Sequence, residues 1–402
     1  MSRVILHCDC NSFFASVETV LNPSYKDVPM AVCGSVEDRH GIVLAKNELA
    51  KRYNIQTAET VYSAKKKCPQ LVICAPHHDE YSLFSKRVNE IYARYTDMIE
   101  PFGIDESWLD VTASQKLFGS GYEIAEKIRR QIKAEIGLTV SIGVSFNKVF
   151  AKLGSDYKKP DAVTVIDEDN FREIVFPLPV SDLLFVGKRT AQILSSYGIR
   201  TIGELASTNA EFLKLKLGKS GEMLHKYANG LDDSPVAENR DAAKSIGNGL
   251  TFKHDLTTLD ECRVAIEHLC DSIGRRLRKN RQICSTVSLT LKNTGLQSVQ
   301  RQRPLDSPTD IARELSKTAY EILLDEWNEK YPLRMITVTA LNLVDTNNSA
   351  VQISLFDDNK EKDHKRENAL DKIRQRYGNT SITSGATLDS DIGIYDIDFD
   401  KK

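Results

Sequence analysis

The sequence predicts an α+β protein of several domains, and three observations support this prediction. The chain has 402 residues, enough for about two to four domains of ordinary size. Apolar runs with the period of strands alternate with amphipathic helical segments over residues 4–166, and the same alternation returns over residues 245–344. Residues 180–230 between them show helical periodicity alone. We therefore expect two mixed α/β units separated by an all-helical one.

The first mixed unit begins with a series of short elements. We expect strands at 4–8, 28–33, 42–45 and 71–74, and helices at 13–21, 46–53 and 83–99. Two short strands follow in an acidic segment at 102–112, then a helix at 124–136 that ends at Gly137, a suitable C-cap. A strand at 139–144, a helix at 148–155 and a strand at 163–166 complete the unit. With the long insert after the first strand set aside, the order is βαββαβ, which is typical of a ferredoxin-like layout.

After Pro177 and Pro179 the sequence pattern changes from alternating strands and helices to helices alone. Helices with short turns at glycines fill residues 180–230, and the polar stretch 232–244 predicts a linker. A second βαββαβ unit follows, with strands at 246–252, 283–292, 297–303 and 333–343 and helices at 260–279 and 309–327. Beyond residue 345 we expect a polar, mobile tail with a short helical piece near 369–377.

The composition is that of an ordinary globular protein, with 41% apolar and 27% charged residues. No apolar run reaches the roughly 18 residues of a membrane span, and the first residues do not have the layout of a secretory leader. The eight cysteines include no C-x-x-C pair, and several lie in apolar runs. We expect reduced thiols in or near the core of a cytoplasmic protein.

The net charge of −2 does not by itself indicate a nucleic-acid partner, but the distribution of charge does. Residues 272–305 contain eight basic residues and no acidic one. A basic stripe of this kind neutralises phosphate backbones, and the alternative is a solvated helix face. The candidate DNA contacts in this stripe are Arg275, Arg276, Arg278, Lys292, Arg301 and Arg303.

An adjacent pair of acids, Asp105 and Glu106, lies at the junction of the two short strands in segment 102–112. Neighbouring carboxylates in an apolar stretch need a partner that neutralises them, and a divalent cation is the usual one. Asp9, at the end of the first apolar run, offers a third carboxylate. Three carboxylates from two neighbouring strands suit a phosphoryl-transfer site with two magnesium ions. The alternative is that Asp105 and Glu106 are ordinary turn residues.

Phe13 and Phe14 follow Asp9 by about one helical turn and are candidate nucleotide contacts. A ring at Phe14 placed against the sugar of a nucleotide would clash with a ribose 2′-hydroxyl and admit deoxyribose. The alternative, which stays open for Phe13 above all, is packing in the core.

Two lysines are candidate contacts for a triphosphate. Lys159 lies in a Lys-Lys-Pro turn after helix 148–155, near the expected carboxylates, where it would act as a point charge. Lys51 lies on the short helix 46–53. Lys152 and Lys158 are expected to be solvated instead.

Two further segments indicate binding to larger partners. Residues 183–205 resemble a helix–hairpin–helix, in which the turn at Gly187 and Lys188 would offer backbone N–H groups to a DNA phosphate. Residues 352–356 place large apolar side chains in a polar tail, where they need a surface on which to dock. The alternative is local packing on the preceding unit.

Three groups of residues in this order resemble the Y-family translesion DNA polymerases. They are Asp9 with Phe13-Phe-Ala-Ser-Val-Glu18, then Ile104-Asp-Glu-Ser-Trp-Leu-Asp110, then the segment from Ser145 to Lys152 with Ser155-Asp-Tyr-Lys-Lys-Pro-Asp161. The resemblance covers residues 1 to about 356. It implies a palm at 1–10 and 78–166, small fingers at 11–77, a thumb at 167–231, a linker at 232–244 and a DNA-binding little finger at 245–344. The mobile tail would then span 345–402.

The resemblance implies an error-prone DNA-directed DNA polymerase that copies past lesions without proofreading. Asp9, Asp105 and Glu106 would hold two Mg²⁺ ions together with the backbone carbonyl of Cys10. Phe14 would exclude ribonucleotides, and Lys159 would contact the triphosphate. Gln352, Leu355 and Phe356 would bind a sliding clamp. The implied partners are primer–template DNA, a deoxynucleoside triphosphate and the clamp, with the polymerase itself a monomer.

The sequence departs from the family pattern in the fingers helix. Glu48 and Lys51 stand where many members have Tyr and Arg, and Ala45 replaces a common hydroxyl residue. A carboxylate at Glu48 would repel a triphosphate unless it pairs with Lys51 or Arg52 one turn along the helix. A DNA-binding accessory subunit without catalysis is therefore an alternative, and a nucleotide cyclase on the same palm is a second.

Overall fold

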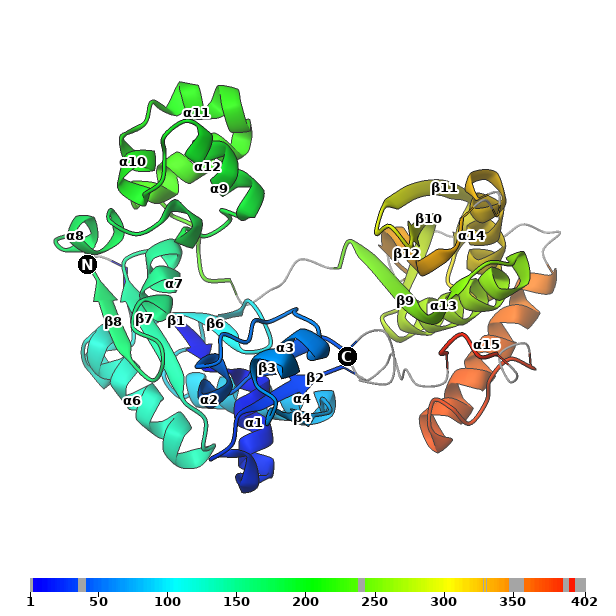
Figure 1. Cartoon of the computed structure of the whole chain (residues 1–402), viewed down its shortest axis with the longest axis horizontal. Coiled ribbons are helices and arrows are strands. Elements are labelled where there is room, and N and C mark those ends of the chain that lie inside the picture. The colour runs from blue at the N-terminus through cyan, green and yellow to red at the C-terminus, as the bar shows by residue number, and fades with distance from the viewer. Residues whose placement is uncertain are drawn as a thin grey trace. The chain divides into compact units, whose positions relative to one another are not determined.

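The computed structural model describes residues 3–34, 41–237, 243–327, 329, 331–346, 358–385 and 390–394, except for the side chains of 358–361. The chain divides into two compact units, the first before the linker near residue 240 and the second after it. Figure 1 shows the elements of each unit. Among the described helices, none combines the length and the apolar character that crossing a bilayer requires.

The first unit contains a five-stranded sheet in the order β5-β6-β1-β7-β8. Its strands are β1 (Ile5–Cys10), β5 (Ile99–Pro101), β6 (Glu106–Asp110), β7 (Val140–Ser145) and β8 (Val163–Ile166). Neighbours are antiparallel except for β7 and β8, which are parallel. Helices α4 (His78–Tyr92) and α6 (Gly121–Glu135) pack on one face, and α7 (Lys148–Tyr157) packs on the other (Figure 1). Set in chain order, β1, α4, β5, β6, α6 and β7 confirm the ferredoxin-like prediction.

The alternation of side chains along β1 separates core from site. Leu6, Cys8 and Cys10 lie in the apolar core under α4 and α6. Ile5 instead packs with Trp108 of β6 and Ala151 of α7, on the other face. Because successive strand residues point to opposite faces, Asp9 shares the α7 face with Ile5.

The insert after β1 forms a small subdomain within the first unit. It contains a three-stranded sheet of order β3-β2-β4, made of β2 (Met30–Cys33), β3 (Val43–Lys46) and β4 (Val72–Cys74). Its helices are α1 (Phe13–Leu21), η1 (Pro23–Tyr25), α2 (Glu48–Lys51) and α3 (Val61–Lys67). Helix α3 was not predicted, although Thr60 caps it by accepting a hydrogen bond from the backbone N–H of Ser63.

The helical part of the first unit follows β8. It comprises α8 (Phe171–Val175), η2 (Val180–Asp182), α9 (Lys188–Ser196), α10 (Ile202–Ser207), α11 (Ala210–Leu217) and α12 (Lys219–Ala228), while the short α5 (Gln115–Phe118) precedes α6. Phe150 and Leu153 of α7 enter the core of these helices. Asn147 links them to the sheet, because its side-chain amide donates to the carbonyl of Gly230 at 2.9 Å.

The second unit is an antiparallel sheet of order β11-β10-β12-β9 with helices on one face. Its elements are β9 (Ser245–Leu256), α13 (Leu259–Lys279), β10 (Gln282–Asn293), β11 (Ser298–Thr309), α14 (Ala312–Glu326) and β12 (Leu333–Asp345). They follow the predicted βαββαβ order, with strands several residues longer than expected. The sheet order differs from that of the first unit, since the first strand, β9, lies at an edge here, whereas β1 lies between β6 and β7.

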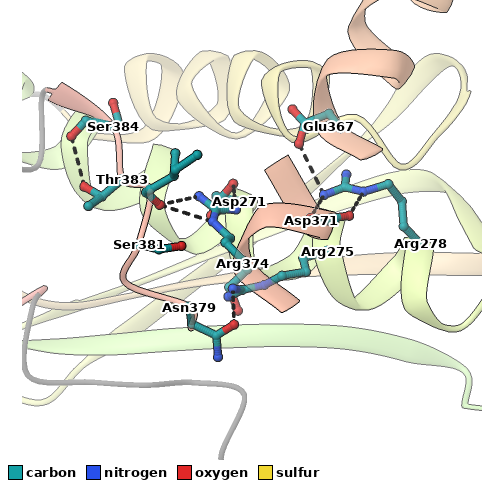
Figure 2. A network of polar contacts seen from close by, with 12 residues as sticks. Asp271, Arg275, Arg278, Glu367, Asp371, Arg374, Asn379, Ser381, Thr383 and Ser384 are labelled. Atoms are coloured by element: carbon teal, nitrogen blue, oxygen red, sulfur yellow. Dashed lines mark hydrogen bonds and ion pairs between the residues drawn. The ribbon is translucent and has the colours of Figure 1, made fainter. Parts of the chain in front are cut away.

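The prediction of a mobile tail is wrong for residues 358–368, whereas the helical piece predicted near 369–377 is confirmed. They form one helix, α15 (Asp358–Tyr377), which lies against α13 (Figure 2). Arg278 of α13 donates to both carboxylate oxygens of Asp371 and lies 3.2 Å from Glu367, while Arg374 of α15 donates to Asp271 of α13 at 3.0 Å. Further on, Ile392 and Ile394 are buried in the core of the unit. The low hydropathy of this helix concealed it, because ion pairs rather than an apolar stripe anchor it.

Candidate active site

Asp9 and Glu106 face each other across two neighbouring strands. They are register partners in the antiparallel pair β1–β6, on the face covered by α7. Asp105 directly precedes β6, and its backbone carbonyl accepts the N–H of Cys10 at 3.0 Å. The three predicted acids are therefore brought together at one end of β1 and β6.

Two lysines from the α7 region bind these acids. Lys159 Nζ lies 2.7 Å from Asp9 Oδ2 and 2.6 Å from Asp156 Oδ1. Lys152 Nζ lies 2.7 Å from Glu106 Oε2. Lys159 is thus near the acids as predicted, whereas Lys152, expected to be solvated, is a neighbour that the sequence analysis missed. Its place on α7, the helix directly before Lys159, was the feature of the sequence that could have predicted this contact.

The three acids differ in how readily they ionise. Burial raises the pKa of Asp9 from 3.8 to about 6, although Lys159 opposes the shift. Burial, together with the nearby charge of Glu106, also raises the pKa of Asp105. For Glu106, burial favours the neutral acid, but hydrogen bonds from His7 and Lys152 outweigh it and lower the pKa to about 2. Burial thus disfavours the ionised form of Asp9 and of Asp105, and added positive charge would favour it.

His7 is a second neighbour that the sequence analysis missed. Its Nε2 lies 3.4 Å from Glu106 Oε2, and its Nδ1 lies 2.8 Å from Ser155 Oγ. The ring is fully buried against Trp108, and this burial lowers the pKa of His7 to about 4. Because His7 lies two residues before Asp9 on β1, strand alternation predicts that the two side chains lie on the same face of the sheet.

A divalent cation fits this donor set. Three carboxylates and the carbonyl at Cys10 are the oxygen ligands that hard divalent ions prefer. In this structure Lys159 and Lys152 hold Asp9 and Glu106, so the ammonium groups stand where positive charge is required. Among the residues described, the three acids do not place one oxygen each within 4.8 Å of one another. At least one of these side chains must therefore turn before the three acids can share an ion.

The two predicted phenylalanines have different environments. Phe14 is half-buried and stacks on Tyr81 of α4, with ring centroids 4.1 Å apart and planes at 14°. Phe13 is 3% exposed and lies in the apolar core. The ring of Phe13 therefore packs in the core, as the alternative interpretation held, and a nucleotide contact at Phe13 stays a prediction. Tyr81, whose hydroxyl donates to Glu18, was missed.

Glu48 pairs with Lys51, as the sequence analysis allowed. Lys51 Nζ lies 2.6 Å from Glu48 Oε1, and Ser12 Oγ donates to the same oxygen at 3.2 Å. Both side chains are about half exposed. The carboxylate is therefore neutralised within its own helix turn.

Comparisons with known proteins agree with this geometry. Residues 8–156 match the impB/mucB/samB family, and residues 243–355 match the C-terminal domain of that family. A DNA polymerase IV from Acetivibrio thermocellus is 49% identical over 392 residues, which are 96% of this chain and 98% of that protein. The chain belongs to the impB/mucB/samB family.

Other members extend the comparison. DNA polymerase IV 1 of Bacillus subtilis is 35% identical over 96% of this chain and 94% of that protein. A solved structure titled a Y-family DNA polymerase chimera of Dbh and Dpo4 covers 85% of this chain and 99% of its own, with 25% identity and a TM-score of 0.76. The predictions of a Y-family fold and of a DNA-directed DNA polymerase as the enzyme class are confirmed, and the family uses divalent metal ions.

In the second unit, most of the basic residues that the sequence predicts to contact DNA are already bonded to other groups of the protein. Arg278 is 6% exposed and is bound by Asp371 and Glu367. Arg301 pairs with Glu326 at 2.8 Å, and Arg303 pairs with acids of α14. The prediction of Arg278 as a DNA contact is wrong, because its guanidinium is enclosed by α15. Arg301 and Arg303 lie on the helix side of β11, opposite core residues of β10.

The opposite face of the same sheet is open and polar. Strand alternation places Lys292, Thr290 and Ser288 of β10 there, beside Gln300 and Gln302 of β11. Gln300 donates to Ser288 Oγ at 3.0 Å. Of the predicted basic contacts, Lys292 belongs to this face, whereas Arg276 donates to the carbonyl of Gly247 and Arg275 to Asn379.

Two predicted contacts lie elsewhere. Gly187 is the exposed N-cap of α9, with nothing within 4 Å of an added Cβ, and Lys188 is exposed beside it. The motif of Gln352, Leu355 and Phe356 lies outside the described residues.

Proposed function

We propose that this chain extends a DNA primer on a template and continues past lesions, transferring a deoxynucleotide to the 3′-hydroxyl with release of pyrophosphate. The observation that supports this most is the pairing of Asp9 with Glu106 across β1 and β6, with Asp105 adjacent. A nucleotidyl transfer site needs acids at this spacing to hold the ions that bind the reacting phosphates. The proposal is supported by the position of the three acids at one end of β1 and β6.

Two magnesium ions are the proposed cofactors. Asp9, Asp105 and Glu106 would hold them, with the backbone carbonyl of Cys10 as a further ligand. When bound, such ions lower the pKa of the attacking hydroxyl and stabilise the leaving pyrophosphate. The raised pKa of Asp9 and of Asp105 supports the assignment, since burial disfavours both carboxylates and a bound cation would stabilise them.

Lys159 acts in nucleotide binding in this proposal. Its ammonium lies between Asp9 and Asp156, at 2.7 and 2.6 Å. A triphosphate carries more charge than either acid, so an incoming nucleotide draws Lys159 away from Asp9. The same movement releases Asp9 for metal binding. Lys51 is held by Glu48 and contributes less than an arginine would.

Phe14 selects the sugar. Its ring is fixed by the stack on Tyr81, and a fixed ring excludes a 2′-hydroxyl more strictly than a mobile one. We also propose that Gly187, Lys188 and the open face with Lys292 contact the backbones of primer and template. The motif Gln352–Phe356 would bind a sliding clamp. The polymerase would act as a cytoplasmic monomer.

Primer extension on undamaged and lesion-containing templates tests the proposal. Wild type with Mg²⁺ should extend with deoxynucleotides and not with ribonucleotides, and Phe14→Ala should gain ribonucleotide use. Asp105→Ala and Glu106→Ala should abolish extension while sparing DNA binding. Extension by both acid variants would reject the site assignment. Absence of extension by wild type with DNA binding intact would favour a non-catalytic accessory subunit.

A further inference from the structure

Three side chains of different metal-binding chemistry meet beside the Phe14–Tyr81 stack. A carboxylate oxygen of Glu18, the sulfur of Cys74 and a ring nitrogen of His77 lie within 4.8 Å of one another. Among the residues that the structure describes, no other group of three such side chains has ligand atoms this close. The palm acids are not part of this group.

The three residues come from three elements of the first unit. Glu18 lies on α1, one turn after Phe14, Cys74 ends β4, and His77 is the N-cap residue of α4. Cys74 and His77 form a Cys-x-x-His sequence, so a short loop fixes their separation. Spacing of this kind is common in sites that bind zinc.

Existing contacts hold the side chains in this arrangement. Glu18 Oε1 accepts the Tyr81 hydroxyl at 2.5 Å and lies 2.8 Å from His77 Nδ1. The Cys74 thiol donates to the carbonyl of Ala75 at 3.3 Å and interacts with Glu18 and Tyr25. The Glu18 side chain is 3% exposed, whereas that of His77 is 58% exposed, so the cluster has an enclosed base and an open side.

We propose that Glu18, Cys74 and His77 bind one zinc-like transition-metal ion, with a fourth position open to water. One thiolate sulfur, one imidazole nitrogen and one carboxylate oxygen suit Zn²⁺ or Co²⁺, whereas Mg²⁺ prefers oxygen alone. On binding, the Cys74 thiol loses its proton to solvent. His77 carries its proton on Nε2 and gives the Nδ1 lone pair to the metal.

Such an ion ties α1, β4 and the start of α4 together. Phe14 lies on α1 and Tyr81 on the first turns of α4, so the ion would hold the two elements whose rings stack. The site is separate from the Asp9, Asp105 and Glu106 acids, and binding there does not depend on the proposed reaction.

Cobalt titration of the full chain tests the proposal. Metal-free, reduced protein is titrated with Co²⁺ in excess Mg²⁺, which occupies sites made of oxygen ligands alone. A thiolate-to-cobalt charge-transfer band should appear in the near ultraviolet, saturate at one equivalent and disappear when Zn²⁺ is added. Cys74→Ser should abolish the band. Cys33→Ser, a buried cysteine on the adjacent strand β2, is the matched control and should keep it.

His77→Gln gives an independent measurement, because its exposed side chain can be changed without opening the core. We expect Co²⁺ affinity to fall by about 10- to 100-fold or more, the range seen when support for a metal site is removed. Absence of the band in wild type, or an equal band in Cys74→Ser, would overturn the proposal. So would unchanged affinity in His77→Gln.

Discussion

The rings of Phe14 and Tyr81 stack with centroids 4.1 Å apart and planes at 14°. This contact joins the α1 helix, which begins three residues beyond Cys10 at the end of β1, to α4 on the core face of the sheet. The Tyr81 hydroxyl also donates to the buried Glu18 one turn along α1. Tyr81 therefore fixes the Phe14 ring both by stacking and by holding its helix.

Replacing Tyr81 should separate these two contributions. Tyr81→Ala removes the stack, so we expect ribonucleotide incorporation to rise although Phe14 is present. Tyr81→Phe keeps the stack but leaves Glu18 short of a donor, so we expect sugar selection to persist with a loss of stability of about 1–3 kcal/mol. Single-nucleotide incorporation kinetics and thermal unfolding measure the two effects. Equal sugar selection in Tyr81→Ala and wild type would contradict this role.

Lys159→Ala should weaken nucleotide binding. Loss of one charge-assisted contact is expected to cost about 1.5–3 kcal/mol, which corresponds to a roughly 10- to 100-fold lower kcat/KM for the nucleotide. Lys158→Ala, one residue earlier and exposed, is the matched control and should have little effect. Steady-state primer extension over a range of nucleotide concentrations measures both.

Asp9 should make catalysis and stability depend on pH in opposite directions. Its folded-state pKa of about 6 lies above the ordinary value of 3.8, so the native chain binds more protons between these values. Stability therefore falls as pH rises through this window, while activity rises because ligation requires the carboxylate. Asp9→Asn should be inactive yet more stable at pH 7 by about 1–3 kcal/mol. A lower Tm for this variant than for wild type at pH 7 would contradict the prediction.

Arg278→Ala should destabilise the second unit. Removing one partner of a buried ion pair leaves charges uncompensated, here Asp371 and Glu367, at a cost of about 3–5 kcal/mol. Arg276→Ala, on the same helix and more exposed, is the control and should change stability by much less. Chemical denaturation followed by circular dichroism distinguishes this from a selective loss of DNA affinity, which the sequence alone predicted.

Lys292→Ala should lower DNA affinity without lowering stability. Each phosphate contact that is lost reduces the slope of log affinity against log salt by about 0.9. Arg303→Ala, on the helix side of the sheet, should change this slope less, because its guanidinium is paired with acids of α14. Fluorescence anisotropy at several salt concentrations measures the slopes.

The sequence was most informative where periodicity and local chemistry agreed. Helix α1 and strand β8 have their predicted bounds, and the acids at 9, 105 and 106 meet as strand alternation requires. Ion pairs between residues far apart in the sequence could not be predicted. That Lys152 reaches Glu106 depends on which side of the sheet α7 covers, and sequence spacing does not encode this.

The basic stripe shows the same limit. Eight cations without a local acid predict a phosphate-binding surface, yet acids more than 15 residues away neutralise several of them. Arg278 meets Asp371 because α15 returns to α13, and Arg303 meets α14 because strand alternation turns it toward the helices. Charge patterning along the chain therefore gave the location of the second unit's cations but not their partners.

The burial of Ile392 and Ile394 in the second unit has a consequence for the order in which the protein is made. The first unit is complete once residue 240 has left the ribosome, and it can fold while synthesis continues. The second unit lacks part of its core until residues 390–394 emerge. A ribosome that stops early therefore releases a chain whose first unit can fold and whose second unit lacks part of its core, and proteases degrade such incompletely folded chains.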